Sequence, residues 1–371
     1  MKILFLVNSL GGGGAEKVLV NLVNNIDRTR YDITIQTLFN AGINRQYLQK
    51  GIRLIESGWK SFRGVSLFFK IMPARILYKL FIENENYDLM VAYLHGAPTK
   101  ILAGCPDKNI KKIAWLHIDM QYSSLGRIFF SRKQIIRIFD IYDRIVGVSA
   151  TVSESFKKIY GLDKKIVTRY NTNNVQQILE LSKITANDFL FPQNNLNIIT
   201  LGRLAKQKGY ERLLRISRKL LDEGLRFNLF ILGKGPEQDK LERYIEKNSL
   251  SDNIKLLGFK VNPYPYLKKA DLFVCSSLTE GLSTVISEAI ILGVPVISTR
   301  VSGAEEVLGN NNEYGVLVEN SEEALYLGMK ELIINRDRIS FYRERARERA
   351  AFFDTMHTVR EVEALMEEVA G

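Results

Sequence analysis

Two successive series of apolar segments, each alternating with helical patterns, constrain the fold of this 371-residue chain more than any other feature. Short apolar runs predict strands of the first series at residues 2–7, 32–38, 88–93, 112–116 and 144–148. The second series predicts strands at residues 196–201, 227–232, 254–257, 272–275, 294–298 and 315–318. Apolar strands that alternate with helices are typical of parallel sheets covered on both faces. The sequence therefore predicts an α/β protein with two doubly wound, Rossmann-like domains.

The length of the chain agrees with two domains, since one domain usually takes roughly 100–200 residues. We assign residues 1–170 to the first domain and residues 171–354 to the second, with the crossing near residues 169–174. The remaining C-terminal segment, about 355–371, predicts an amphipathic helix with Val359, Val362 and Leu365 on one face. Ligands of doubly wound folds bind beyond the carboxyl ends of the strands, so two such domains are expected to face a central cleft.

The charge of the chain favours an anionic partner. Lys and Arg number 52 against 41 Asp and Glu, which gives a net charge of +11. Basic residues are mixed with large apolar ones at residues 60–79 and again at 126–144, as in segments that lie on a membrane surface. The alternative is a pair of ordinary helices whose cations snorkel to solvent. Because no helix-turn-helix or RNA-binding pattern appears, we expect an anionic membrane surface and not nucleic acid as the partner.

The cysteines and the apolar runs indicate a reducing compartment. Cys105 and Cys275 are far apart and match no metal-ligand spacing, so we expect two free thiols. The first apolar run, residues 1–7, is too short for a signal peptide and predicts a strand. No apolar run approaches the roughly 20 residues that span a bilayer. We therefore expect a cytoplasmic protein, peripheral on the inner face of the cytoplasmic membrane.

The run EGLSTVISEAIILGVPVIST is the most informative local motif. Glu280 lies in a loop, Ser283 and Thr284 predict a helix start, and Glu288 falls in the second turn of that helix. A helix N-terminus favours an anion, because its first N–H groups lack partners within the helix. Carboxylates accept hydrogen bonds from hydroxyl groups. A diphosphate joined to a polyhydroxylated group, as in a nucleotide-sugar, fits this combination, whereas the bland alternative is two surface acids near a helix start.

Three further motifs follow predicted strands, and each also has a structural interpretation. Arg203 and Lys208 flank a loop after a strand, where fixed cations suit a diphosphate; elsewhere such residues are usually solvated. Gly233 lies in LGKGP, which also describes a simple turn. His117 ends a strand, and it is either a ligand-binding residue or a surface histidine.

The loop LGGGGAEK, which holds Gly13 and Gly14, joins the first strand to a helix and exposes backbone N–H groups to a ligand. A dinucleotide fingerprint would need glycine at Glu16 and an acidic residue about twenty positions further on. The second predicted strand ends at Leu38, and no carboxylate follows until Glu56, which disfavours a nicotinamide or flavin enzyme. No Walker A sequence occurs either. A tight structural turn remains the alternative at this loop.

The ordered set of motifs resembles the retaining glycosyltransferases of family 4, which have the GT-B architecture. The set comprises GGAEK, WLH, GRLAKQKG, LGKGP and the E-x7-E run, and it extends over most of the chain. The resemblance implies that the C-terminal helix returns to the first domain. It also implies transfer of a hexose or N-acetylhexosamine, with retention of configuration, from a nucleotide-sugar, which we expect to be UDP-linked. The acceptor is expected to be a hydroxyl of a lipid-linked glycan, in capsule, lipopolysaccharide or related cell-surface polysaccharide biosynthesis.

The same resemblance implies roles for individual residues. His117, Arg203, Lys208 and Glu280 are the candidate catalytic residues, with His117 and Glu280 at the donor sugar and the two cations at the diphosphate. Glu288 is expected at the ribose hydroxyls, and Thr284 and Val285 are expected to offer N–H groups to the diphosphate. The candidate donor-binding residues are Gly13, Gly14, Gly233, Gly281, Leu282, Ser283, Thr284, Val285 and Glu288.

Two departures from the family pattern bear on this interpretation. Asn171 is followed by Thr172 where the family often shows proline, which weakens the placement of the hinge. No Asp-x-Asp occurs, so we expect no metal ion and no cofactor, with the diphosphate neutralised by Arg203 and Lys208. Two alternatives stay open: a nucleotide-sugar 2-epimerase of similar architecture, which would turn over the donor without an acceptor, and a non-catalytic, degenerate transferase.

Overall fold

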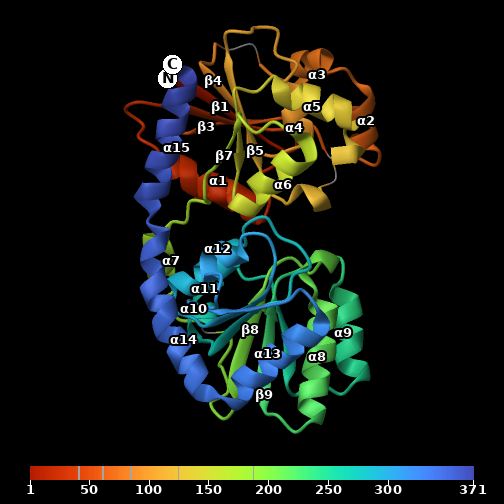
Figure 1. Ribbon diagram of the computed structural model, residues 1–371, viewed down its shortest axis with the longest axis vertical. Coiled ribbons are helices and arrows are strands. Elements are labelled where there is room, and N and C mark those ends of the chain that lie inside the picture. Colours follow the sequence, from red (N-terminus) through yellow and green to blue (C-terminus); the bar gives the residue numbers. More distant parts are fainter. Residues whose placement is uncertain (41, 61, 84–85, 124, 187) are drawn as a thin grey trace. The chain divides into compact units, whose positions relative to one another are not determined.

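The computed structural model describes residues 1–40, 42–60, 62–83, 86–123, 125–186 and 188–371. The chain divides into two compact units, each an α/β assembly (Figure 1). The first unit comprises Met1–Thr172 and Thr355–Gly371, and the second comprises Asn173–Asp354. The sequence-based boundary at residues 170 and 171 lies slightly before this division.

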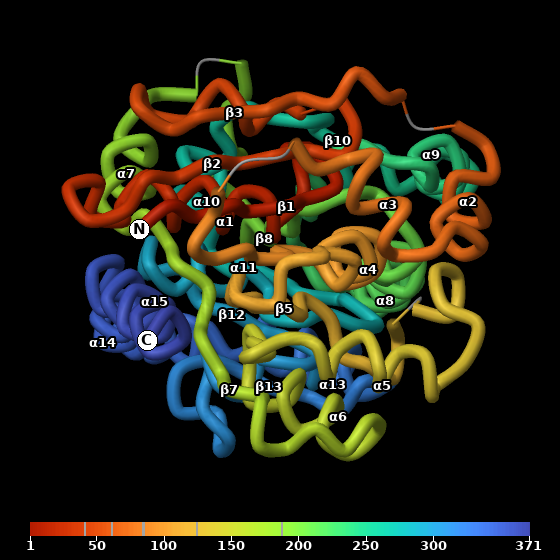
Figure 2. The backbone as a smooth tube through the Cα atoms, turned by 90° about the horizontal axis from the view of Figure 1, so that it is seen from above, coloured from red at the N-terminus to blue at the C-terminus, as the bar shows by residue number. Residues whose placement is uncertain are grey.

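The first unit is built on a seven-stranded sheet within the described residues, in the order β3-β2-β1-β4-β5-β6-β7. All of its pairings are parallel, and Figure 2 labels β3, β2, β1, β5 and β7, which follow one another in this order. The strands are β1 (Lys2–Val7), β2 (Asp32–Thr37), β3 (Arg53–Glu56), β4 (Leu89–Ala92), β5 (Lys111–Leu116), β6 (Arg144–Gly147) and β7 (Ile166–Thr168). The strand order reverses direction between β1 and β4, which makes the edge beyond these two strands a site where ligands of such sheets bind.

Helices cover both faces of this sheet, because the inner strands are apolar on both sides. The α-helices are α1 (Gly14–Asn25), α2 (Val65–Ile71), α3 (Ala74–Phe81), α4 (Ala97–Leu102), α5 (Arg132–Asp140), α6 (Ala150–Tyr160) and α15 (Thr355–Ala370). The 3-10 helices are η1 (Ile43–Tyr47), η2 (Met120–Tyr122) and η3 (Leu125–Arg127).

The C-terminal helix α15 belongs to the first unit and packs beside α1 (Figure 1). Val359, Val362 and Leu365 are buried in this packing. The carboxylate of Glu363 accepts a hydrogen bond from the backbone N–H of Asp27 at 2.8 Å. The face of the helix that the amphipathic pattern predicts is therefore the face that is buried.

The described residues of the second unit repeat the architecture with a six-stranded parallel sheet, in the order β10-β9-β8-β11-β12-β13. Its strands are β8 (Leu196–Leu201), β9 (Phe227–Leu232), β10 (Ile254–Gly258), β11 (Leu272–Cys275), β12 (Val296–Thr299) and β13 (Val316–Val318). Its helices are α7 (Val175–Leu181), η4 (Lys206–Lys208), α8 (Tyr210–Asp222), α9 (Gln238–Lys247), α10 (Tyr264–Lys269), α11 (Thr284–Ile291), α12 (Ala304–Leu308), α13 (Glu322–Ile334), α14 (Arg336–Arg349) and η5 (Ala350–Phe353).

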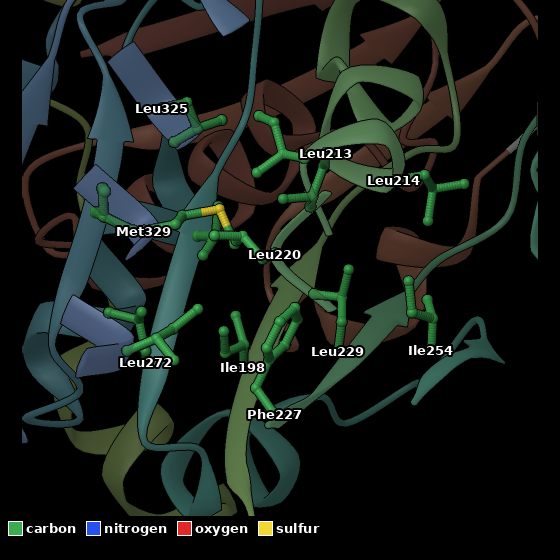
Figure 3. Close-up of a cluster of buried hydrophobic side chains, with 14 of the residues drawn as sticks. Ile198, Leu213, Leu214, Leu220, Phe227, Leu229, Ile254, Leu272, Leu325 and Met329 are labelled. Carbon is green, nitrogen blue, oxygen red and sulfur yellow. The ribbon is translucent and has the colours of Figure 1, made fainter. Parts of the chain in front are cut away.

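Two apolar clusters hold this unit together, one on each face of the sheet. Successive side chains of a strand point to opposite faces, so Ile198 enters the cluster beneath α8 and α13 while Ile199 enters the other. Figure 3 shows Ile198 among Leu213, Phe227 and Met329, which come from α8, β9 and α13. The strands and the helices on both faces of the sheet contribute side chains to these clusters. The carboxyl ends of the strands therefore project from a well-packed core.

Two short strands, β3 and β7, were missing from the sequence-based prediction. β3 reads RLIE and lies at one edge of the first sheet, and β7 has three residues and lies at the other edge. Neither has the continuous apolar run of an inner strand, because an edge strand has only one neighbour. Tertiary pairing with β2 and β6, respectively, defines these elements.

Candidate active site

The strand order of the second unit reverses between β8 and β11, which pair directly. The loop after β8 carries Arg203 and Lys208, and the loop after β11 carries Glu280. Because the carboxyl ends of parallel strands share one edge of the sheet, the two loops meet there. The backbone N–H of Leu278 donates to the carbonyl of Gln207 at 2.7 Å, and Ser276 Oγ donates to the carbonyl of Lys208 at 2.9 Å.

Lys208 and Glu280 form an ion pair across these loops. Lys208 Nζ lies 2.6 Å from Glu280 Oε1, and Ser277 Oγ donates to the same oxygen at 2.6 Å. The two side chains are only 18% and 10% exposed. Burial by itself would lower the pKa of Lys208, but the charge of Glu280 and its hydrogen bond outweigh burial and raise that pKa. The ammonium group therefore stays protonated at the edge where ligands of this fold bind.

Glycines let these loops approach each other backbone to backbone. Gly209 has φ 65°, and a Cβ placed on it would lie 2.0 Å from the carbonyl oxygen of Ser276. Gly233 has φ 141°, and its Cβ would lie 1.9 Å from the carbonyl oxygen of Gly202. A side chain at either position would push the loops apart. The predicted importance of Gly233 thus has a packing reason in addition to any contact with a ligand.

The start of α11 forms the other side of this loop region. Ser283 is its N-cap residue, and its side chain makes no capping hydrogen bond. Thr284 and Val285 are half-buried, whereas Gly281 and Ser283 are buried and Leu282 is half-buried. Positive dipole charge at a helix start favours an anion. The hydroxyl oxygen of Thr279, just before Glu280, is buried and has no hydrogen-bond partner among the described residues.

Glu288 has different surroundings from Glu280. It is almost fully buried on α11, and Tyr264 Oη donates to its Oε1 at 3.4 Å. Arg203 contrasts with both carboxylates because it is exposed. Of the residues predicted for the second unit, the structure therefore brings Lys208 and Glu280 into direct contact, with Gly233 packed against the same loop.

A buried arginine that was not predicted from the sequence supports the loop after β11. Arg212 on α8 donates to the carbonyls of Ser276 and Ser277 at 2.9 and 2.7 Å. It also donates to Thr299 Oγ1 at 3.3 Å and to Asn320 Oδ1 at 2.9 Å. All four acceptors are neutral, and burial lowers the pKa of the guanidinium. Arg212 thereby holds the segment that positions Glu280 and supplies positive charge beneath it.

Replacing Arg212 by leucine is expected to lower the free energy of unfolding by about 2–3 kcal/mol, because buried carbonyls lose their donor. Arg215→Leu on the same helix is the matched control. Arg215 pairs with Glu322 at 2.6 Å, but both side chains are almost half exposed, so the loss should stay below about 1 kcal/mol. Urea unfolding measures both changes, and equal losses would contradict the positioning role of Arg212.

The predicted residues of the first unit follow β1 and β5, which lie on either side of β4 in the sheet. Gly13 is the N-cap of α1, and a Cβ on it would lie 2.2 Å from Glu16 Oε2. The Glu16 side chain therefore folds back over the helix start, and burial raises its pKa despite a hydrogen bond from its own backbone. Gly13 and Gly14 are both exposed.

His117 lies directly after β5 and packs its ring 4.8 Å from that of Tyr93. Its Nε2, and Nδ1 of His95 after β4, are buried and have no hydrogen-bond partner among the described residues. Burial lowers the pKa of His117 to about 3, with a contribution from His95, against a hydrogen bond to the backbone of Tyr93 that raises it. Burial lowers the pKa of His95 to about 4. Both imidazoles are therefore neutral at physiological pH.

The lowered pKa values of these two histidines predict that the stability of the protein depends on pH. The unfolded chain binds their protons near pH 6.5, well above the folded pKa values of about 3 and 4, so stability falls as the pH drops below 6.5. For His117 the loss between pH 7.5 and pH 5 should be about 1–2 kcal/mol. Urea unfolding of the protein and of His117→Asn at both pH values measures it. The variant should lose less stability than the wild type between these pH values. Identical losses would show that His117 does not cause the pH dependence.

Comparison with known proteins agrees with the two-unit organisation. The family model described as Glycosyltransferase Family 4 matches residues 12–177, and the model described as Glycosyl transferases group 1 matches residues 183–350. A relative from Campylobacter jejuni is 26% identical over 97% of this chain and 98% of its own length. It is named N-acetylgalactosamine-N,N'-diacetylbacillosaminyl-diphospho-undecaprenol 4-alpha-N-acetylgalactosaminyltransferase. An uncharacterized glycosyltransferase of Methanocaldococcus jannaschii is 35% identical over 65% of this chain and 62% of its own length.

Solved structures share the whole fold. Anabaena HepE in complex with UDP superimposes with a TM-score of 0.77 at 19% identity, covering 99% of this chain and 100% of HepE. TarM of S. aureus superimposes with a TM-score of 0.73 at 14% identity, covering 98% and 99%. Both are GT-B proteins, and the two parallel α/β units of this chain have the same architecture. The chain is therefore a GT-B glycosyltransferase whose first unit belongs to glycosyltransferase family 4 and whose second belongs to the group 1 glycosyl transferases.

Proposed function

We propose that this glycosyltransferase moves a hexose or N-acetylhexosamine from a UDP-sugar to a hydroxyl of a lipid-linked glycan, with retention of anomeric configuration. The reaction would serve cell-surface polysaccharide biosynthesis. The observation that carries the proposal is the half-buried Lys208–Glu280 pair, 2.6 Å apart, at the strand-order reversal beside the start of α11. A cation and a helix start suit a diphosphate, and a carboxylate suits sugar hydroxyls.

Loss of the nucleotide diphosphate is the demanding step of this reaction. The bond from the anomeric carbon to the phosphate oxygen breaks, and a bond from that carbon to the acceptor oxygen forms on the same face. The acceptor proton passes to the leaving phosphate. Lys208, Arg203 and the N–H groups of Thr284 and Val285 would stabilise the charge that develops on the diphosphate, which is electrostatic preorganisation. In this proposal no metal ion is required.

Other residues would orient the sugar. Glu280 accepts a hydrogen bond from Ser277 on one oxygen, so its second oxygen can accept from a sugar hydroxyl. His117, with a pKa of about 3, stays neutral and would exchange hydrogen bonds with the donor sugar without adding charge. Glu288 would bind the ribose, which requires its buried carboxylate to become accessible next to Tyr264.

The choice of donor and acceptor is supported by similar proteins. HepE, whose fold is shared, has been solved with UDP and with UDP-glucose. The C. jejuni relative carries N-acetylgalactosaminyltransferase and diphospho-undecaprenol in its name. Other relatives are named for colanic acid and lipopolysaccharide core biosynthesis. No helix in the described part of the chain is long and apolar enough to cross a membrane.

A panel of nucleotide-sugars, incubated with the purified protein and with or without bacterial membrane extract, tests this proposal. We expect UDP release from one UDP-sugar only when the extract is present, with the sugar transferred to extractable lipid and with activity that survives a chelator. Conversion of the donor without extract would indicate an epimerase. Absence of binding to every donor would indicate a non-catalytic protein.

A further inference from the structure

Two stretches of the first unit carry cations but no carboxylates. Residues 57–82 contain five Lys or Arg and no Asp or Glu, and residues 120–139 contain four Lys or Arg and again no Asp or Glu. The chain as a whole has 41 acidic residues among 371, so two such stretches stand out from its average composition. Both supply positive charge that is not offset by acidic residues of the same segment.

Large apolar side chains project outward from these same segments. Leu67 and Ile71 of α2 are 57% and 60% exposed, and Ile76 and Leu80 of α3 are 48% and 47% exposed. Each pair is spaced i, i+4, so its members share one face of the helix. The core-facing positions of these helices are filled by other residues, namely Phe69, Leu77 and Tyr78. The outward residues are therefore not needed for packing of the first unit.

The fold brings the two segments together. Lys70 Nζ on α2 donates to the carbonyl of Gly126 at 2.9 Å, and it lies 5.3 Å from the ring centroid of Phe130, which is 64% exposed. The helix α2 also packs against η3, the short 3-10 helix that holds Arg127. We name the resulting surface the basic apolar face. Its residues are Arg63, Leu67, Lys70, Ile71, Arg75, Ile76, Lys79, Leu80, Arg127, Phe130 and Lys133.

A buried lysine fixes the position of α2 in this face. Lys100 of α4 is 2% exposed, and its Nζ donates to the carbonyls of Phe69 and Lys70 at 2.7 and 2.8 Å. Cations at a helix C-terminus are stabilised by the orphan carbonyls and the helix dipole. Gly104 has no side chain, and a Cβ on it would lie 2.0 Å from the carbonyl oxygen of Ala74. This glycine therefore lets the start of α3 pack closely against the chain that follows α4. The face is thus already formed in the isolated protein.

We propose that the basic apolar face docks on an anionic lipid bilayer, with the aliphatic and aromatic side chains entering the headgroup region and the cations contacting lipid phosphates. Cations alone would suit any anionic partner, but apolar side chains that project singly from helix ridges, interleaved with cations, match an interfacial segment. The proposal deepens the proposed function, because it names the surface through which a lipid-linked acceptor is reached. The charge, exposure and contacts of the basic apolar face do not depend on which sugar is transferred.

Co-sedimentation of the full chain with vesicles tests the proposal. One set of vesicles is pure phosphatidylcholine, and the other contains about one third phosphatidylglycerol, without any glycan acceptor. We expect binding to the anionic vesicles that weakens as salt is added. Leu67→Ser with Ile71→Ser, and separately Arg63→Glu with Lys79→Glu, should each reduce the partition coefficient at least about tenfold.

The chain offers a matched control for the loss of apolar surface. Leu327 and Ile334 on α13 are 55% and 61% exposed, close to the values for Leu67 and Ile71, but they lie in the second unit. Leu327→Ser with Ile334→Ser should leave vesicle binding unchanged. A wild-type protein that stays in the supernatant, equal binding to both vesicle types, or an equal loss in the control would overturn the proposal.

UDP binding, measured by calorimetry on the same variants, separates this proposal from the proposed function. Unchanged UDP affinity together with lost vesicle binding supports the docking face. Vesicle binding by a protein that transfers no sugar would refute the proposed function and leave the docking face standing.

Discussion

Lys208→Met is expected to reduce kcat/KM for sugar transfer by roughly 10²–10³, which corresponds to about 3–4 kcal/mol of transition-state stabilisation. Lys208 Nζ lies 2.6 Å from Glu280 Oε1, and the pair is largely screened from water. Without the ammonium group, the carboxylate of Glu280 would stand unpaired beside the incoming diphosphate. Both the lost donor and the added repulsion oppose departure of the nucleotide. Steady-state kinetics with a saturating acceptor measures the change.

Lys206→Met is the matched control for this variant, because Lys206 lies in the same 3-10 helix but is exposed. We expect its kcat/KM to stay within about threefold of wild type, since exposed charges are screened by solvent. Adding Glu280→Gln to the Lys208→Met variant removes the unpaired carboxylate. The double variant should therefore be more stable than Lys208→Met alone, but it should not regain activity. Near-normal transfer by Lys208→Met would remove Lys208 from the active site.

Gly209→Ala is the second substitution with a large expected effect. Its backbone has φ 65°, and the added Cβ would meet the carbonyl oxygen of Ser276 at 2.0 Å. The left-handed conformation alone costs about 1–2 kcal/mol for alanine, and relief of the backbone clash must separate the loops that hold Lys208 and Glu280. We therefore expect a total loss of at least about 3 kcal/mol in the free energy of unfolding, together with loss of UDP binding.

Gly161→Ala separates the cost of the left-handed conformation from the cost of the backbone clash. Gly161, which ends α6, has φ 74° and ψ 25°, nearly the same backbone conformation as Gly209, but nothing lies within 4 Å of its Cβ position. It should lose only about 1–2 kcal/mol and keep UDP binding. Urea unfolding and calorimetry give both quantities. If the two variants behaved alike, the close approach of the loops would have no part in donor binding.

Much of the fold could be predicted because the inner strands are apolar on both faces. The ends of β8 and β9 coincide with the predicted residues 196–201 and 227–232. The chain returns to the first unit at α15, as the family resemblance implied. The edge strands β3 and β7 were not predicted. They are only partly buried, and they are too short or too polar to give a periodic hydrophobic signal.

The site was less accessible to sequence reasoning than the fold. Lys208 and Glu280 were each predicted from local motifs, but they are 72 residues apart, and their contact depends on the pairing of β8 with β11. Arg212 could not be found, because an arginine in an amphipathic helix normally points to solvent. Its burial follows from its place at the start of α8, beneath the loop after β11.

A crystal structure of the complex with UDP would show whether the strand-order reversal of the second unit holds the donor diphosphate. We expect diphosphate oxygens within hydrogen-bond distance of Lys208 Nζ and of the backbone N–H groups of Thr284 and Val285, with the uridine ribose toward Glu288. A diphosphate bound elsewhere, with the Lys208–Glu280 region unchanged and remote from it, would contradict this placement of the donor site.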